Sequence, residues 1–388
     1  MYTHTNTVLH QLLNFLPKDR FHRFVGQHNG DKWVKSLTTW NQLVVLMYAQ
    51  ATGKDSLREI ETGLSLHQGV WHHLGIQSVK RSTLSYANSN RDWHIFEHLF
   101  YALLERSKDI TPNRTFSFKN PLYALDATVI RLCLSLFDWA HYRKAKGALK
   151  LHTLLNVRTD IPEVIVSSDG KKGDVTAAKE LVLWDTLEKG SIVVFDRAYI
   201  DYAWWRKLDE QGLFFVSRTK TNQSFVVLGQ HTEASGSVLA DEYVMSTEYS
   251  SVEKYPERLR RVRFAADGVV YEYVTNNMKL TGVQIAEIYK ARWHVELFFK
   301  WIKQNLTIKA FLGTSENAVL TQVWIAMIYY LLLAYVKFQT RFGKSMLELT
   351  RMIRETLLVR RPLIDMLSLS IKTIRRFRPP EVEQLALL

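Results

Sequence analysis

Cysteine is almost absent from this sequence of 388 residues. The single cysteine, Cys133, excludes a disulfide framework and a zinc site built from cysteines. A secretory signal pattern is also missing at the N-terminus, and the longest apolar run, residues 323–336, is too short to span a bilayer. These absences predict a cytoplasmic protein in a reducing compartment, with no membrane as partner and with the apolar run forming a buried helix.

Acidic residues are outnumbered in this chain. There are 51 Lys and Arg against 38 Asp and Glu, which gives a net charge of +13 and a pI near 9.6. A basic protein of this size commonly binds a polyanion, nucleic acid before a membrane surface. Residues 341–380 alone hold ten Lys or Arg and three acids, spread among apolar positions with helical spacing. The charge pattern therefore predicts a basic helical surface in this segment and nucleic acid as the partner.

The pattern of apolar residues changes along the chain and predicts an α/β fold with added helical and β-rich regions. Helical periodicity with capping signals fills the N-terminal region. From Pro121 onward, β-rich segments are interspersed with a helical stretch, which is typical of an α/β sheet. A later segment indicates consecutive antiparallel strands, with Asp267-Gly268 as a hairpin turn. We predict a helical region at 1–115, an α/β core at 116–213 and 278–320, a β-strand insertion at 214–277, and a basic helical region at 321–388.

Two short helices are predicted around Gly75, and a helix-turn-helix is one interpretation of them. In that interpretation the front of the second helix meets DNA. Because short helices joined by a glycine are common, a packing role is an equally good interpretation. The candidate DNA-contacting residues are Lys80, Arg81, Ser82 and Thr83.

Two aspartates lie in strands that are otherwise apolar. Asp126 lies inside LYALDATVI, and Asp196 ends SIVVFD. Continuous apolar strands are central strands, buried on both faces. An ionised aspartate there is costly unless it is paired or bound to a metal. Two such residues therefore indicate a shared purpose.

A third carboxylate, Glu296, lies on a predicted helix that begins near Gly282, where Thr281 and Gln284 have the spacing of a capping box. At about 100° per residue, four polar residues of this helix fall within an arc of about 60°. Glu287 points to the opposite side. A solvated stripe of ion pairs is the alternative interpretation of this arc. The four residues are Tyr289, Arg292, Glu296 and Lys303.

The three carboxylates, Asp126, Asp196 and Glu296, have a donor chemistry that favours particular metals. Hard oxygen ligands without His or Cys suit Mg²⁺ or Mn²⁺. Two such ions can clamp the attacking and leaving oxygens of a phosphodiester. Together with the excess of positive charge, this donor set favours a metal-dependent nuclease or a strand-transfer enzyme.

In these features the sequence resembles the DDE transposases of bacterial insertion sequences. Asp126 stands in DAT and Asp196 in FDRAY, and KAKGALKLHTLLNV resembles that group's second strand with its approach. The helix has a complete Tyr-Arg-Glu-Lys signature, with intervals of two, three and six residues, as in the insertion-sequence-four family. The resemblance runs from about Tyr123 to Gln304.

The resemblance implies a ribonuclease-H-like catalytic core. Asp126 would lie on its first strand, Asp196 on its fourth and Glu296 on its last helix. The β-rich segment would be a domain inserted between Asp196 and Glu296, and the N-terminal helical region would recognise DNA ends. The three carboxylates would be the catalytic residues and would bind two Mg²⁺ ions, with Mn²⁺ as a substitute.

The same resemblance implies a reaction and its partners. The activity would be cut-and-paste transposition by phosphodiester hydrolysis and strand transfer, through a DNA hairpin. The DNA partners would be terminal inverted repeats and target DNA, held by a homodimer in a synaptic complex at the bacterial nucleoid. Tyr289, Arg292 and Lys303 would grip the phosphates beside the scissile bond, with the arginine fork suited to bidentate contact.

Several further residues have two interpretations. Lys150 and His152 are candidate DNA contacts on the second strand, with a structural role as the equal alternative. Hairpin-forming relatives stack a flipped base on a tryptophan, but core packing is the favoured role for the nearby tryptophans Trp204, Trp205 and Trp293. His94 and His98 have the helical spacing of zinc ligands, yet without further ligands a surface or packing pair is favoured.

Two alternatives to the transposase stay open at this point. One is a DNA-binding protein that keeps the fold without catalysis, against which the intact acidic triad and signature argue. The other is a metal-dependent nuclease without strand transfer. The β insertion and the helical N-terminal region argue against this second alternative, since a simple nuclease needs neither.

Overall fold

The computed structural model describes most of the chain, which divides into two compact units. One unit joins residues 1–110 to residues 301–388, and the other comprises residues 111–300. Cys133 and the last part of the basic segment, residues 369–380, lie outside the described residues. The described residues are 6–107, 115–132, 137, 139, 141–143, 146–169, 172–181, 183–305 and 311–368.

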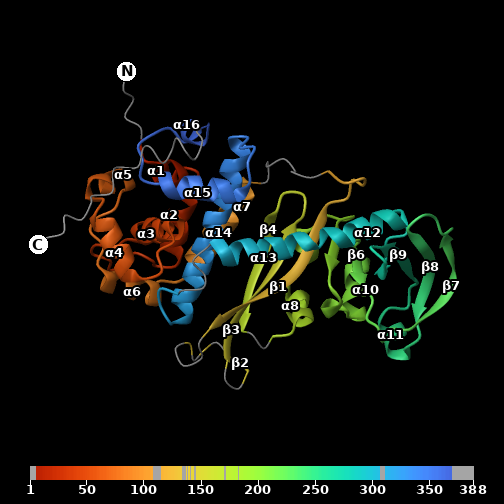
Figure 1. Cartoon of the computed structure of the whole chain (residues 1–388). Coiled ribbons are helices and arrows are strands. Elements are labelled where there is room, and N and C mark those ends of the chain that lie inside the picture. The colour runs from red at the N-terminus through yellow and green to blue at the C-terminus, as the bar shows by residue number, and fades with distance from the viewer. Residues whose placement is uncertain are drawn as a thin grey trace, which may run out of the picture. The chain divides into compact units, whose positions relative to one another are not determined.

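Helix α14, Glu316–Gln339, is the central helix of the helical unit (Figure 1). It packs on α3, α6, α7 and α15. A helix that is apolar on every side must be buried on every side, and every residue from Ala318 to Leu333 is buried. In the described part of the chain it is the one helix long and apolar enough to cross a membrane, and 89% of that stretch is buried within the protein. The prediction of a buried helix at 323–336 is therefore confirmed.

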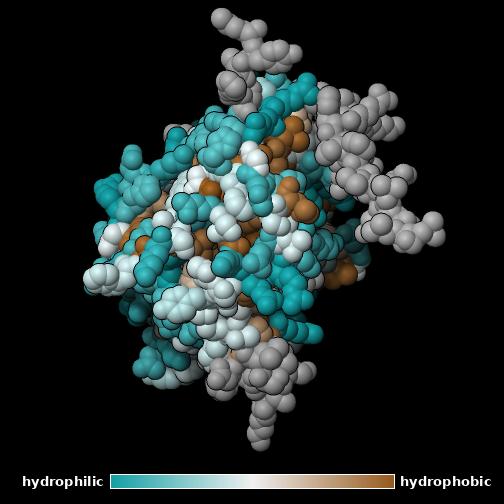
Figure 2. All heavy atoms as spheres, turned by 90° about the vertical axis from the view of Figure 1, so that its left-hand side faces the viewer, coloured by the Kyte–Doolittle hydropathy of each residue, from teal (hydrophilic) through white to brown (hydrophobic). Residues whose placement is uncertain are grey.

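The other helices of this unit pack on α14 or on one another. The face turned toward the viewer in Figure 2 is mostly hydrophilic, with small apolar patches between polar side chains. The helices are α1 Val8–Leu13, α2 Lys18–Gln27, α3 Thr39–Thr52, α4 Leu57–Ser65, α5 Trp71–Leu74, α6 Arg81–Asn90, α7 His94–Arg106, α15 Met346–Thr356 and α16 Leu363–Ser368.

A ten-stranded mixed sheet forms the second unit, so the α/β class predicted from the sequence is confirmed. Its strands follow the order β2-β3-β1-β5-β6-β10-β9-β8-β7, and β4 pairs with β3. Strand β5 is parallel to both β1 and β6, and the other pairs are antiparallel. The strands are β1 Leu122–Leu132, β2 His141–Arg143, β3 Lys146–Asn156, β4 Ile161–Asp169, β5 Ile192–Phe195, β6 Phe214–Arg218, β7 Phe225–Thr232, β8 Val238–Ser246, β9 Leu259–Ala266 and β10 Val269–Thr275.

The segment 214–277, predicted as an insertion, continues this sheet rather than forming a second one. Strand β6 pairs with β5, and β10 then pairs with β6, so the antiparallel strands extend the same hydrogen-bonded ladder. The predicted Asp267-Gly268 turn joins β9 to β10, with φ values of +50° and +75°. Positive φ at both central residues is what a tight hairpin turn requires, so this turn is confirmed.

Helices cover the sheet and fill its core. Trp204 and Trp205 on α10 are fully buried against Phe195 and Phe215 of the sheet. This is the packing role favoured from the sequence, whereas Trp293 is 56% exposed. Helix α12 crosses strands β5, β6, β8, β9 and β10. The helices are α8 Asp174–Glu180, α9 Leu183–Thr186, α10 Tyr202–Glu210, α11 Tyr249–Lys254, α12 Gly282–Ala291 and α13 Trp293–Asn305.

Candidate active site

Parallel pairing of β1 with β5 brings Asp126 and Asp196 to neighbouring positions. Leu125 is the register partner of Phe195. Asp126 is the next residue of β1, and Asp196 directly follows the end of β5. Neighbouring strands lie about 4.8 Å apart, so the two carboxylates belong to one site. Each is fixed by a backbone amide: Asp126 accepts from the N–H of Ala127, and Asp196 from that of Ala198, both at 2.8 Å.

A predicted single helix proves to be two helices. Helix α12 starts with the predicted capping box of Thr281 and Gln284, but it ends at Ala291, and α13 begins at Trp293. Around Arg292 the backbone makes two hydrogen bonds that each span three residues. The N–H of Arg292 donates to the carbonyl of Tyr289, and the N–H of Val295 donates to the carbonyl of Arg292, each at 3.2 Å. This tighter turn has no proline or glycine to mark it in the sequence.

Arg292 at this break joins the helix to the sheet. Its guanidinium donates to Glu296 Oε1 at 2.6 Å and to Asp126 Oδ2 at 3.2 Å. The Arg292 guanidinium also lies 5.8 Å from the centre of the Tyr289 ring. The structure thus gathers five predicted site residues: Asp126, Asp196, Tyr289, Arg292 and Glu296. Lys303 lies on α13, seven residues after Glu296, and its phosphate contact stays a prediction.

Glu287 is separate from this group, as the helical spacing predicts. Its carboxylate accepts a hydrogen bond of 3.0 Å from Ser117 Oγ. Glu287 and Glu296 are therefore carboxylates of neighbouring helices with different surroundings, and Glu287 provides an internal control for the candidate site.

The candidate site is rich in negative charge. Three carboxylates, those of Asp126, Asp196 and Glu296, lie near one another, and Arg292 hydrogen-bonds to two of them, Asp126 and Glu296. Burial raises the pKa of Asp126 to about 6, with the charges of Asp196 and Glu296 adding to the rise and Arg292 opposing it. Such a shift in a partly buried carboxylate with named charged neighbours is typical of functional sites.

Carboxylate oxygens are the donors that Mg²⁺ and Mn²⁺ prefer, and a further cation would relieve the repulsion at Asp126. Within the described ranges, no three acidic, histidine or cysteine side chains are already grouped as a metal site. Arg292 is hydrogen-bonded to both Asp126 and Glu296, so its guanidinium lies between two of the three carboxylates. The oxygen donors of the three carboxylates are of the kind that fits divalent metals.

The structure does not bring Lys150 and His152 to the carboxylates. Asp126 is opposite Thr153 on β3, and directly opposed residues project from the same face while neighbours alternate. Lys150 and His152 therefore project from the other face. There Lys150 Nζ lies 2.6 Å from Asp174 Oδ1, and His152 is fully buried with Nε2 3.0 Å from Ser168 Oγ. These contacts fit the structural alternative, and contact with DNA stays a prediction.

The helical unit contains the other predicted residues. Helix α6 begins at Arg81, and Lys80, Arg81 and Ser82 are exposed while Thr83 is half-buried. Their contact with DNA stays a prediction. His94 and His98 are connected only indirectly, through Asp92 and His28. His94 Nδ1 lies 2.6 Å from Asp92, and His98 Nδ1 lies 3.3 Å from His28.

An open depression of about 410 Å³ adjoins Asp196, and sequence reasoning missed it. Two cationic side chains line it, those of Arg197 and Lys220, with the polar side chain of Asn222. Arg197 follows Asp196 in FDRAY and could have been found there. Lys220 and Asn222 lie in the turn after β6 and reach the site only because β6 pairs with β5, which no local pattern reveals.

A series of tyrosines was also missed. The rings of Tyr271 and Tyr273 on β10 stack at 6.2 Å between centres, and Tyr273 lies 4.9 Å from Tyr289. Arg218 lies 5.0 Å from the Tyr271 ring. The alternation in YEYVT was the available signal, since residues two apart on a strand share a face. Through the contact of Tyr273 with Tyr289, the series connects β10 to helix α12 of the candidate site.

Comparison with known proteins gives consistent results. The family described as Transposase DDE domain matches residues 117–332, and a domain of unknown function (DUF4372) matches residues 4–77. Transposase y4zB of Sinorhizobium fredii is 32% identical over 72% of this chain and 77% of its own length. The transposase of insertion sequence element IS5377 from Geobacillus stearothermophilus is 29% identical, covering 69% and 70%, and that of IS4SA from Synechocystis is 27% identical, covering 72% and 78%.

Among solved structures, a piggyBac transposase synaptic complex with hairpin DNA aligns with 96% of this chain and 80% of its own chain. The TM-score is 0.45 and the sequence identity is 10%. A likeness of that size does not establish a shared fold.

Proposed function

The chain belongs to the DDE transposases of bacterial insertion sequences, enzymes with endonuclease and strand-transferase activity, and on this premise we propose that it performs cut-and-paste transposition. Hydrolysis at an element end would free a 3′-hydroxyl and leave a 5′-phosphate. The 3′ oxygen would then bond to phosphorus on the opposite strand and displace that strand's 3′ oxygen, which closes a hairpin. The observation that carries the proposal is that Arg292 hydrogen-bonds to both Asp126 and Glu296, while Asp196 follows the strand paired beside Asp126.

Asp126, Asp196 and Glu296 would hold two Mg²⁺ ions, which Mn²⁺ can replace. When bound, this pair of ions supplies activation of the attacking oxygen and stabilisation of the leaving one. The backbone amides of Ala127 and Ala198 fix the two aspartates. The pairing of β1 with β5 keeps these ligands on a rigid part of the fold.

Arg292 would have two successive partners. Without metal and DNA it is the counter-ion of Asp126 and Glu296. With those carboxylates holding metal, its planar fork would take a DNA phosphate through two hydrogen bonds. Tyr289 beside it and Lys303 further along α13 would contact the same strand. Arg197 and Lys220 would receive the backbone on the Asp196 side.

The sheet order supports a ribonuclease-H-like core. If the short β2 is not counted, Asp126 lies on the first strand and Asp196 follows the fourth, as the family resemblance implies. We assign the core to residues 116–213 and 278–320, the insertion to 214–277, end recognition to 1–115, and a basic DNA-facing surface to 321–388. A homodimer would hold two terminal inverted repeats and the target DNA in one synaptic complex, in the cytoplasm at the nucleoid.

The test is cleavage of a duplex that contains the element's end, with Mg²⁺ or Mn²⁺. Wild type and Glu287→Gln should nick at the boundary and go on to hairpin and joined products. Glu296→Gln should be slower by roughly 10³-fold or more, because loss of a metal ligand removes several kcal/mol of transition-state stabilisation. Glu287→Gln is matched to it because Glu287 contacts Ser117 outside the site.

Two results would replace the proposal. If wild type binds the element's end but never cleaves it, the protein is a DNA-binding protein of the same fold without catalysis. Cleavage by wild type at any sequence, with no joined product, would leave a metal-dependent nuclease.

A further inference from the structure

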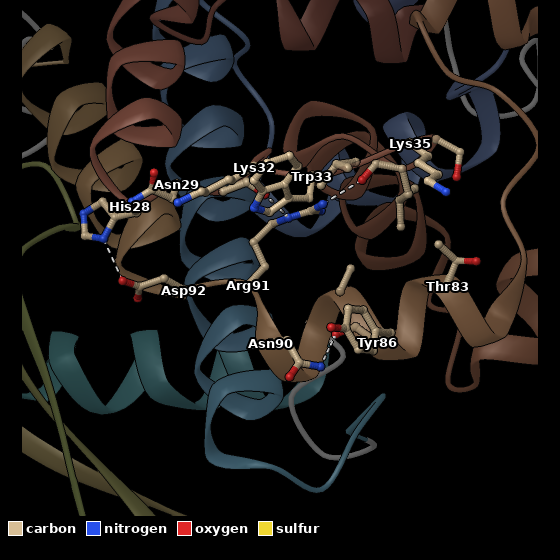
Figure 3. A pocket seen from close by; sticks show the side chains of 15 residues that line it. His28, Asn29, Lys32, Trp33, Lys35, Thr83, Tyr86, Asn90, Arg91 and Asp92 are labelled. Carbon is tan, nitrogen blue, oxygen red and sulfur yellow. Dashed lines mark hydrogen bonds and ion pairs between the residues drawn. The ribbon is translucent and has the colours of Figure 1, made fainter.

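The helical unit has a pocket of about 530 Å³ between the segment 28–37 and helix α6 (Figure 3). Lys32, Trp33 and Lys35 of the segment face side chains of α6 across it. The α6 residues are Thr83, Tyr86 and Asn90. We call it the Trp33 pocket.

Trp33 is exposed and in an unfavourable backbone conformation. Its side chain is 89% exposed, and its φ is +63°. A bulky residue rarely adopts positive φ, and such strain persists where the surroundings enforce it, most often at functional sites. A large aromatic ring gains most from burial. An exposed and strained tryptophan is therefore best explained by a partner that covers it.

Arg91 holds the segment that presents Trp33. Its guanidinium donates to the carbonyl of Gly30 at 2.8 Å and to that of Leu37 at 2.7 Å. Asp31 also accepts hydrogen bonds from the N–H and hydroxyl of Thr39, at 2.6 and 2.7 Å. The segment is thus fixed at both ends, and the pocket is formed before any partner arrives.

Helix α6 presents one polar and aromatic face to the pocket. Thr83, Tyr86 and Asn90 are three and four residues apart, which places them on one side of the helix, where the buried Ala87 also lines the pocket. Leu84 and Asn88 are buried on the other side. Tyr86 is 72% exposed. The sequence of α6, RSTLSYANSN, has no acidic residue.

The charge around the pocket is positive. Lys32 and Lys35 are exposed, as are Lys80 and Arg81 at the start of α6. The one acidic side chain among the lining residues is Asp92, and its carboxylate oxygens each lie 2.6 Å from a histidine nitrogen, of His28 and His94. A partner that matches this surface is negatively charged and presents flat or apolar groups to aromatic rings.

We propose that the Trp33 pocket binds the duplex DNA of the element's end. Lys32 and Lys35 contact phosphates, and Trp33 and Tyr86 pack on the sugars of the backbone. Thr83 and Asn90 reach base edges in the groove that α6 enters, because a helix fits the major groove and these side chains donate and accept hydrogen bonds. The inference rests on the proposed function, and it assigns a role within the segment matched by the domain of unknown function.

Binding of a labelled end duplex and of a scrambled duplex tests the pocket by fluorescence anisotropy. Trp33→Asn removes the indole and keeps a residue that tolerates positive φ, so the fold and the melting temperature should be retained. Its affinity for the end duplex should fall roughly tenfold, as expected when a large aromatic anchor is removed from an interface. Lys32→Ala should lower the slope of log affinity against log salt by about 1.

Tyr249→Ala is the matched control, since Tyr249 is 84% exposed on α11 in the other unit. It should bind like wild type. The pocket proposal is overturned if Trp33→Asn and Tyr86→Ala both bind the end duplex as tightly as wild type does. It is also overturned if Trp33→Asn changes only the oligomeric state, since a second copy would then be the partner. If wild type itself binds the end duplex no better than the scrambled duplex, the result contradicts the proposed function rather than the pocket alone.

Discussion

Two arginine–aspartate pairs in the sheet unit have the same chemistry and different surroundings. Arg260 of β9 and Asp241 of β8 are fully buried and joined by two hydrogen bonds of 2.7 Å. Arg260 also donates to the carbonyl of Asn277 at 3.1 Å, and Thr232 donates to Asp241 at 2.7 Å. Burial alone would raise the pKa of Asp241, but these hydrogen bonds outweigh it and the pKa is lowered.

The second pair is less well satisfied. Arg292 is shared between Asp126 and Glu296, and its single bond to Asp126 is 3.2 Å long. At Asp126 the effect of burial outweighs the attraction of Arg292, and the pKa of Asp126 is raised to about 6. A closed pair with every charge satisfied stabilises the fold. At the acidic site Arg292 hydrogen-bonds to only two of the three carboxylates, and we propose that this group, unlike the buried pair, can bind a further cation.

The largest expected effect is on folding stability. Asp241→Asn should lower the free energy of unfolding by roughly 3–5 kcal/mol, because it leaves the buried charge of Arg260 without its partner. Asp126→Asn should leave that free energy unchanged or slightly higher, because it removes a carboxylate that burial disfavours. Urea unfolding of both variants beside wild type measures the difference.

The neighbouring pair of Arg261 and Glu242 is the control. Its atoms also approach to 2.6 Å, but both side chains are partly exposed, so Glu242→Gln should change the free energy of unfolding by no more than about 1 kcal/mol. If Asp126→Asn were as destabilising as Asp241→Asn, the acidic site would be a structural pair and the distinction would be lost.

Lowering the pH should weaken the stabilisation that the buried pair of Arg260 and Asp241 gives to the fold. The pKa of Asp241 is lower in the folded than in the unfolded state, where an aspartate titrates near 3.9. Its contribution to stability is therefore complete above about pH 4 and is lost as the pH falls through the folded pKa. Wild type should lose more unfolding free energy between pH 5 and pH 3 than Asp241→Asn does, when both are measured in urea. Parallel losses would show that Asp241 is not the group responsible.

Features of the fold and of the candidate site could be predicted from the sequence where they depend on neighbouring residues alone. Asp196 at the end of SIVVFD and the capping box of Thr281 follow from nearby residues, and the structure contains both. The meeting of Asp126 with Asp196 depends on which strands pair, for which the family resemblance, not periodicity, gave the expectation. Lys220 shows the limit, because only the pairing of β6 with β5 brings it near Asp196.

The face of the sheet on which a side chain lies, and the group with which it pairs, were harder still to predict. Lys150 and His152 were candidates because they lie on the strand beside Asp126, but a shift of one residue decides the face on which a strand's side chains project. Nothing in RLRRVRF distinguishes Arg260, which is fully buried, from Arg261, which is partly exposed. Helical spacing placed Arg292 beside Glu296, yet it could not show that Asp126 would lie on the other side of the guanidinium.

The smallest expected effect concerns competition for the acidic site. If Arg292 is the counter-ion that divalent metal displaces, Mg²⁺ should raise the melting temperature of Arg292→Ala more than that of wild type. An extra stabilisation of about 1 kcal/mol corresponds to roughly 2–4 °C in a unit of this size. Arg261→Ala controls for loss of a positive charge elsewhere on the sheet and should respond to Mg²⁺ as wild type does. An equal shift in all three proteins would mean that metal binds without displacing Arg292, and the guanidinium would then be a fixed part of the site rather than an exchangeable counter-ion.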